Sequence, residues 1–128
     1  SYQPSLNKVI HGEKILEMQE LVRRVPVSSY VIEYAVKLVR SSRPGGPESL
    51  PFVKDWVEWG AGPRASQHLI LSAKARAIMN DRYVASVEDV KGVATSILRH
   101  RIINNFKAQA EGITSLDIIA RLLEEIKP

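Results

Sequence analysis

The stretch Trp59-Gly60-Ala61-Gly62-Pro63-Arg64-Ala65-Ser66 opens the longest unbroken helical pattern of the chain. Pro63 suits the first position of a helix, because its missing N–H would be unpaired there and its φ is already helical. Gly62 is then the N-cap residue, and it has no side-chain oxygen to cover the first amides. Residues 64–79 contain no Gly or Pro and are apolar over more than half of the helix circumference. We therefore expect a central helix that packs on several sides.

Arg64 falls in the first turn of this helix, beside the positive end of the helix dipole, which disfavours a cation by about 0.3–1 kcal/mol. Open amides and a guanidinium at one helix start are the features of an anion site, for example a site for phosphate. Gly60, Gly62 and Pro63 would support such a site through the backbone that they form. The alternative is that Arg64 lays its stem over a nearby tryptophan and keeps its charge in water. The local sequence leaves both interpretations open.

The composition is that of a single globular domain that can bury a core. The chain has 128 residues, of which 45% are hydrophobic and 25% are charged, and it has no cysteine. The absence of cysteine excludes a disulfide framework, a thiol nucleophile and a cysteine-based metal site. No apolar run approaches the roughly 20 residues of a membrane span, and no signal segment is present, so we predict a cytoplasmic protein. The net charge of +4 suits an anionic ligand without requiring one.

Further helices are predicted from apolar residues at helical spacing. They cover residues 13–24, residues 28 or 29 to about 42, a short segment from 52 that ends at Trp59, residues 86–98, and residues 114 or 115 to 126. Residues 1–12 show no sustained period and are predicted to be a linker or tail. The sum is five or six helices with no convincing strand. We therefore predict an all-α fold, a small helical bundle.

Details of two helices are also predicted. Ser86 and Asp89 have the spacing of a capping box, and Asp117 is placed to cap the last helix in the same way. Gly92 costs helix propensity, about 1 kcal/mol relative to Ala, and is expected to mark a tight crossing. Leu116 is expected among the buried residues of the last helix.

Several kinds of catalytic site are missing. The chain has no P-loop, no apolar run that ends in paired acids for Mg²⁺, and no serine in a nucleophile elbow. His11, His68 and His100 lie far apart and lack metal-ligand spacing. We therefore expect no metal site, and we expect no catalysis by this chain alone.

The basic residues of interest are Arg23, Arg24, Arg40, Arg43, Arg64, Arg99 and Arg101. On one surface they could bind phosphates, whereas scattered arginines are ordinary helix-end charges. Arg99 and Arg101 are two positions apart, so on a helix at most one of them would face a ligand. The structural alternative for this pair is that they bind Glu111 or cap carbonyl groups at a helix end.

The stretch 59–66 resembles the sensor-2 motif of MoxR-type AAA+ ATPases. Val84…Glu88-Asp89-Val90, Leu98-Arg99-His100-Arg101-Ile102 and Ala110-Glu111-Gly112-Ile113 are similar to the C-terminal segment of the same family. The resemblance covers roughly residues 12–127 and concerns the small helical lid domain, which we place at 13–127. It implies that the P-loop, the Mg²⁺-binding acids and the arginine finger belong to a preceding core domain absent from this chain.

The resemblance implies that Arg64 is the sensor-2 arginine and reaches the γ-phosphate of ATP. Arg99 and Arg101 are our candidates for secondary basic contacts. It implies ATP with Mg²⁺ as the cofactor of a full-length parent that hydrolyses ATP, with no tight nucleotide binding by this chain alone. The partners implied are the parent's own core, neighbouring subunits of a ring oligomer, and proteins with von Willebrand factor A domains. The implied role is a chaperone-like ATPase in which nucleotide state moves the lid.

Two other functions stay open beside the lid. A freestanding nucleic-acid-binding module would need the arginines on one face and binding that falls steeply with salt, and we do not expect nucleic acid as a partner. A protein-interaction bundle would expose Trp56 and Trp59 as a docking patch. That interpretation loses its support if both indoles are buried.

Overall fold

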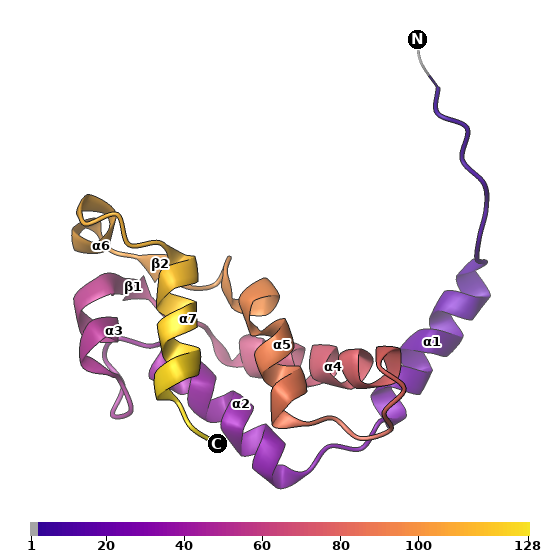
Figure 1. Cartoon of the computed structure of the whole chain (residues 1–128), viewed down its shortest axis with the longest axis horizontal. Coiled ribbons are helices and arrows are strands. Elements are labelled where there is room, and N and C mark those ends of the chain that lie inside the picture. The colour runs from indigo at the N-terminus through magenta and orange to yellow at the C-terminus, as the bar shows by residue number, and fades with distance from the viewer. Residues whose placement is uncertain (1–2) are drawn as a thin grey trace.

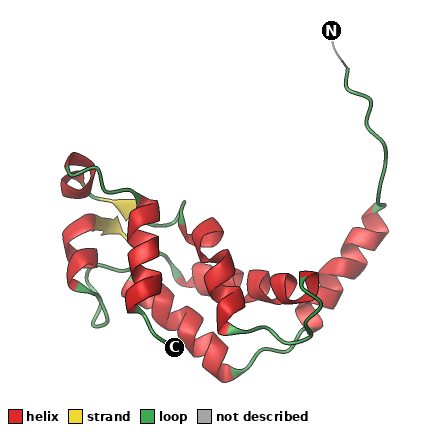
Figure 2. Cartoon of the chain, in the orientation of Figure 1, coloured by secondary structure: helices red, strands yellow, loops and turns green. Residues whose placement is uncertain are grey.

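The computed structural model describes residues 3–128 and consists mainly of helices (Figure 1, Figure 2). In chain order the elements are α1 (Gly12–Arg24), α2 (Ser29–Ser41), α3 (Pro51–Trp56), β1 (Val57–Trp59), α4 (Pro63–Met79), α5 (Val87–Leu98), β2 (Ile103–Asn104), α6 (Phe106–Ala110) and α7 (Ser115–Glu125). The prediction of a small all-α bundle is confirmed, and α6 is a short helix beyond those that the apolar spacing indicated. Residues 3–11 of the predicted tail are exposed and irregular, and residues 1 and 2 lie outside the described residues.

The sequence predicted no strand, and this was wrong for two short segments. β1 pairs with β2 in antiparallel orientation, with Val57 opposite Asn104 and Trp59 opposite Ile103. Trp59, which we expected at the end of a short helix, therefore lies in a strand. Strands of three and two residues are too short to show an alternating pattern, so the sequence carried no signal for them.

α4 is the central helix, as predicted. It packs against α1, α2 and α5 (Figure 1). Its buried row repeats every fourth residue and consists of Ala65, Leu69, Ala73 and Ala77. Three of these four side chains are methyl groups, which lets the neighbouring helices approach the α4 backbone closely. α5 crosses α4 at a steep angle (Figure 1), and Arg76 near the end of α4 contacts residues in the first half of α5.

The helix starts follow the capping signals in the sequence. Ser86 and Asp89 form a capping box at the start of α5, and Thr114 and Asp117 form one at the start of α7. The prediction for Leu116 was wrong, because this residue is 45% exposed in the first turn of α7. The buried face of α7 begins two residues later and consists of Ile118, Ile119 and Leu122.

Asp89 is a fully buried carboxylate that joins α4 to α5. Arg76 Nη1 donates a hydrogen bond to its Oδ1 at 2.9 Å, and Arg82 Nη1 donates one to its Oδ2 at 2.6 Å. Arg82 also contacts Oδ1 through Nη2, and the Ser86 amide and hydroxyl both donate to Oδ2 at 2.9 Å. The hydrogen bonds from Arg82, Ser86 and Arg76 hold the pKa of the Asp89 carboxyl well below its usual range, although burial alone would raise this pKa.

Gly92 leaves the space that Arg76 needs to reach Asp89. A Cβ atom at Gly92 would lie 2.4 Å from Arg76 Nε and 2.7 Å from its Cζ. The expected tight crossing is therefore present, and its close contact is between the α5 backbone and the Arg76 side chain.

We expect Asp89→Asn to lower the free energy of unfolding by about 3 kcal/mol, because removing one charge of a buried pair leaves its partners unmatched. This loss lies at the low end of the range for buried charge pairs, because both arginines are about 40% exposed. Since the folded-state pKa of Asp89 is lowered, its contribution is complete above the unfolded-state pKa of about 4 and is lost as the pH falls toward the folded-state value. Urea denaturation at neutral pH and along an acid series measures both effects.

Asp117→Asn is the matched control, because Asp117 occupies the same capping position on α7. Its carboxyl pKa is also lowered, by the Thr114 backbone and hydroxyl, but it is exposed and has no arginine partner within residues 3–128. We expect a smaller loss for this variant. Equal losses for the two variants would contradict the role of the arginines.

Candidate functional site

The start of α4 has the form that the sequence predicted. Pro63 is the first helical residue, and Gly62 is an extended N-cap with φ −82° and ψ 174° that supplies no side-chain hydrogen bond. Arg64 follows in the first turn and is exposed. Within residues 3–128 its guanidinium makes no hydrogen bond and no ion pair. Pro63 has no N–H and the Ala65 amide donates to the Gly62 carbonyl at 3.0 Å, so the Arg64 amide and its unengaged guanidinium are the donors left at this helix start.

The backbone before this helix is fixed to the end of α2. The Ala61 amide donates to Ser42 Oγ at 2.9 Å, and Arg43 Nε donates to the Ala61 carbonyl at 2.8 Å. Ser42 Oγ in turn donates to the Val39 carbonyl at 2.7 Å. Ala61 and Ser42 are fully buried, so these bonds are shielded from water.

Gly60 is required by the close approach of the two chain segments. A Cβ atom at Gly60 would lie 2.4 Å from the Ser42 carbonyl oxygen and 2.7 Å from Arg43 Cα. At Gly62 a Cβ atom would meet nothing within 4 Å. The two glycines thus have different roles: Gly60 allows the backbones to touch, and Gly62 leaves the helix start uncapped.

The turn 99–101 follows the end of α5. α5 ends at Leu98, so Arg99 and Arg101 are in a turn, and the premise that they are spaced along a helix was wrong.

Arg99 and Arg101 differ in what they contact. Arg101 Nη1 donates to the Ile97 carbonyl at 2.5 Å and contacts His100 Nε2, so it caps the end of α5, as one alternative predicted. The predicted pairing with Glu111 was wrong, because Glu111 Oε2 accepts a hydrogen bond from Trp56 Nε1 at 3.2 Å. The Arg99 side chain is exposed and has no hydrogen-bond or ion-pair partner among the described residues.

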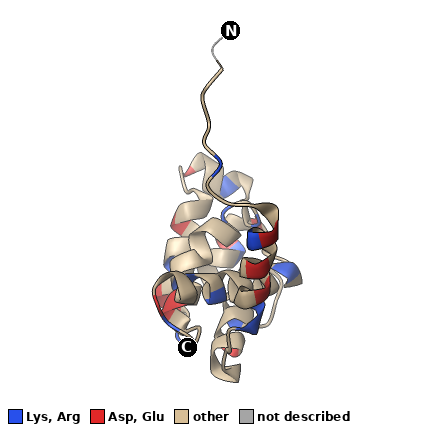
Figure 3. Ribbon diagram, turned by 90° about the vertical axis from the view of Figure 1, so that its right-hand side faces the viewer, with Lys and Arg blue, Asp and Glu red and all other residues tan. Residues whose placement is uncertain are grey.

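The other arginines do not form one free basic face. Arg24 lies 3.5 Å from Glu20, Arg40 lies 3.2 Å from Glu48, and Arg43 binds the Ala61 carbonyl. Figure 3 shows basic and acidic residues interspersed on the side of the molecule that carries α1. This arrangement gives no support to a nucleic-acid surface.

The two tryptophans have different environments. Trp56 is partly buried, with its ring centroid 6.0 Å from that of Phe52 and with the Arg121 guanidinium 5.3 Å from its own centroid. Trp59 is 67% exposed in β1. One indole therefore remains available for an interaction.

Residues 3–128 contain neither a candidate metal site nor a candidate membrane-spanning helix. These residues contain no cluster of three or more histidine, cysteine or acidic side chains that could hold a metal ion. None of their helices combines the length and apolarity that crossing a membrane requires.

The family model of the AAA lid domain matches residues 52–122, which include β1, the start of α4 and the turn 99–101. The chain belongs to the AAA lid domain family. This lid is 29% identical over 123 residues to the chaperone MoxR1 of Mycobacterium tuberculosis, covering 96% of this chain and 33% of that protein. It is 27% identical over 123 residues to the uncharacterized protein YeaC of Bacillus subtilis, covering 96% of this chain and 36% of that protein.

A solved structure is similar to this lid as well. It is the crystal structure of a "putative ATPase" from Cytophaga hutchinsonii, which is 35% identical, with a TM-score of 0.84, over 90% of this chain and 35% of that one. Together these similarities make the chain a MoxR-family AAA+ lid domain. The lid spans about a third of the length of the curated relatives that it matches.

Sequence reasoning missed Ser42, Arg43 and Arg82 as residues of this lid that position others. The stretch 43–47 was recognisable only as a loop, because its Pro and Gly residues say nothing about a contact some 18 positions away. Ser42 carried no signal beyond its place at the end of an apolar helix.

We expect Gly60→Ala to lower the free energy of unfolding of the lid by about 1–3 kcal/mol or more. The added methyl group overlaps backbone atoms, which cannot rotate away as a side chain can. Gly62→Ala is the matched control and should change stability by less than about 1 kcal/mol, because its Cβ has open space. Thermal unfolding followed by circular dichroism compares the two. Equal melting temperatures for both variants would show that the Gly60 contact does not fix the segment.

Proposed function

We propose that this chain is the C-terminal, sensor-2 lid of a MoxR-like AAA+ protein that hydrolyses ATP, and that Arg64 contacts the phosphates of ATP. The observation that carries the proposal is the uncapped, exposed start of α4 with an unengaged guanidinium. Membership in the AAA lid domain family and the similarity to the chaperone MoxR1 support it.

The donors at this helix start suit a phosphate. Gly62 supplies no side-chain oxygen and its carbonyl accepts from the Ala65 amide at 3.0 Å, so the Arg64 amide keeps its hydrogen-bonding capacity for an anion. The Arg64 guanidinium adds a charge-assisted contact of planar, forked geometry. A phosphate would also relieve the unfavourable position of Arg64 at the positive end of the helix dipole.

Arg64 would couple nucleotide state to lid position. A contact that is present with ATP and weakened after hydrolysis gives each nucleotide state a different preferred lid orientation. The Gly60–Ala61 segment is hydrogen-bonded to Ser42 and Arg43. A change in the position of Arg64 would therefore also change the position of α2. Arg99 is the second basic contact in this proposal, and Arg101 holds the turn that presents it.

The rest of the machinery would come from the core domain that precedes the lid. ATP with Mg²⁺ is the cofactor that the AAA+ family implies, and residues 3–128 have no carboxylate cluster for the metal. We therefore propose that this chain alone hydrolyses no ATP and that its parent does. The parent would act in the cytoplasm as a chaperone-like ring oligomer, with its own core and neighbouring subunits beside the lid and with proteins carrying von Willebrand factor A domains as partners.

A protein-interaction role is the second candidate. Trp59 is 67% exposed and lies opposite Ile103, which is 52% exposed. Exposed apolar neighbours of this size are typical of docking sites. This role is compatible with the lid and would replace it only if Arg64 has no effect on ATP turnover.

In the intact parent we expect Arg64→Ala to reduce ATP turnover by the equivalent of about 2–4 kcal/mol in transition-state stabilisation, because a charge that stabilises the reacting phosphate is removed. Arg24→Ala is the matched control, since Arg24 is also an exposed helical arginine and lies on α1, which packs near the other end of α4. It should leave turnover unchanged. Steady-state kinetics and ATP affinity measure both variants, and an Arg64→Ala variant with wild-type turnover and affinity would remove Arg64 from the mechanism.

A further inference from the structure

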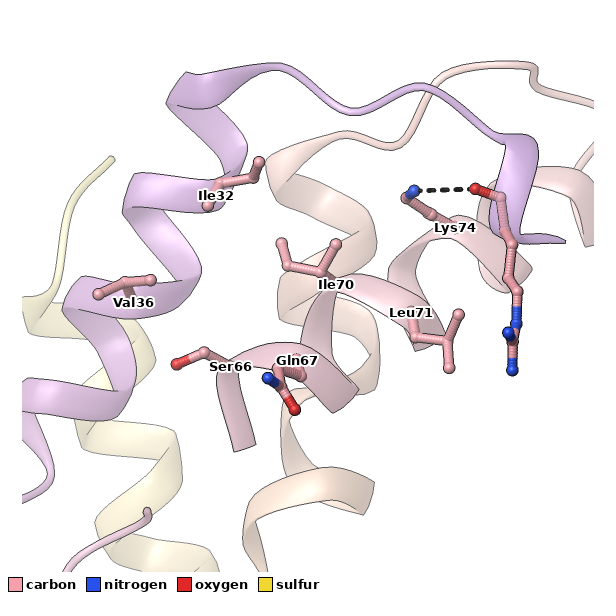
Figure 4. Close-up of a pocket in the computed structure, with 8 residues that line it drawn as sticks. Ile32, Val36, Ser66, Gln67, Ile70, Leu71 and Lys74 are labelled. Atoms are coloured by element: carbon pink, nitrogen blue, oxygen red, sulfur yellow. Dashed lines mark hydrogen bonds between the residues drawn. The ribbon is translucent and has the colours of Figure 1, made fainter. Parts of the chain in front are cut away.

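An apolar groove of about 480 Å³ runs between α2 and the first half of α4, with one end at α1 (Figure 4). Ile32 and Val36 from α2 face Ile70 from α4 across it, and Leu71 extends the apolar surface. Ile32 is 40% exposed and Leu71 is 43% exposed, so this surface faces solvent. The volume matches that of a site for a few large apolar side chains.

The charged residues that line the groove have one sign. Its eight lining residues include two cations, Arg23 and Lys74, and no carboxylate. Lys74 Nζ donates to the Arg23 carbonyl at 3.2 Å, which uses one of its three N–H groups and holds the ammonium at the α1 end of the groove (Figure 4). At the opposite end, Ile32 and Val36 also line an adjoining depression whose charged residues have both signs: Glu33, Lys37, Arg40 and Glu48.

We propose that the α2–α4 groove binds an acidic amphipathic helix of a partner protein. Apolar side chains at helical spacing would fill the floor formed by Ile32, Val36, Ile70 and Leu71. Carboxylates that flank those side chains would face Arg23 and Lys74, whose charges have no acidic partner within residues 3–128. Charge complementarity thus selects an acidic helix over a basic one.

The groove is separate from the phosphate contact but lies on the same helix. Arg64 does not line it, and Ser66 and Gln67, which do, lie two and three residues after Arg64 along α4. Binding in the groove needs neither ATP nor the core domain, so this proposal goes beyond the lid function and can fail without it.

Two short designed helical peptides test the proposal by fluorescence anisotropy on the chain itself, without nucleotide. Both carry leucines at helical spacing, with flanking glutamates in one and lysines at the same positions in the other. We expect the glutamate peptide to bind more tightly by about tenfold, the size given by two solvent-exposed ion pairs. Amide chemical shifts should change at residues of the α2–α4 groove. Lys74→Glu should remove the preference for the glutamate peptide.

Leu71→Asp should abolish binding, because it places a charge in the apolar floor. Leu116→Asp is the matched control, since Leu116 is a helical leucine of similar exposure, 45%, that does not line the groove. It should bind like the wild type, and melting curves confirm that each variant is folded. Equal affinity for the two peptides, no binding of either, or shifts confined to other surfaces would overturn the proposal. Self-association of the wild type that Leu71→Asp abolishes would overturn it too, because a second copy would then occupy the groove.

Discussion

The hydrogen bond from the Ala61 amide to the buried Ser42 hydroxyl is the interaction on which the proposed site depends. It joins the end of α2 to the segment that precedes α4, and the missing Cβ of Gly60 permits the close approach. A buried hydrogen bond at a close backbone contact tolerates little displacement, because separation would leave two buried polar groups unpaired. The position and direction of the first turn of α4, and with it Arg64, are therefore set by the core.

A second constraint sets how α5 lies on α4. Asp89 binds Arg76 and Arg82 and also closes the capping box at the start of α5. One carboxylate thus fixes the start of α5 near the end of α4. Arg64 and Arg99 make no contact with Asp89. The charged residues that stabilise the fold are therefore different from those proposed to bind phosphate.

Local signals predicted much of the fold. Pro63, Gly62 and the two capping boxes gave the helix starts because the residues that form a cap are neighbours in sequence. The position of Arg64 in the first turn of α4 followed from the same signals. The resemblance to MoxR-type lids rested on this stretch together with segments 84–90, 98–102 and 110–113, and the family match and the similarity to the chaperone MoxR1 bear it out.

What the sequence did not predict depends on contacts between distant residues. The β1–β2 pair joins segments too short to have a period. Arg82 looked like part of a connector, and only the fold brings it to Asp89. The hydrogen bond from Arg101 to the Ile97 carbonyl likewise depends on where α5 ends, at Leu98.

The most direct test of the account is a structure of the full-length protein bound to a non-hydrolysable ATP analogue. The account predicts a guanidinium nitrogen of Arg64 within about 3 Å of a phosphate oxygen, with the Gly60–Ala61 segment still bound to Ser42. A nucleotide whose phosphates contact only other residues, with Arg64 in solvent, would contradict it.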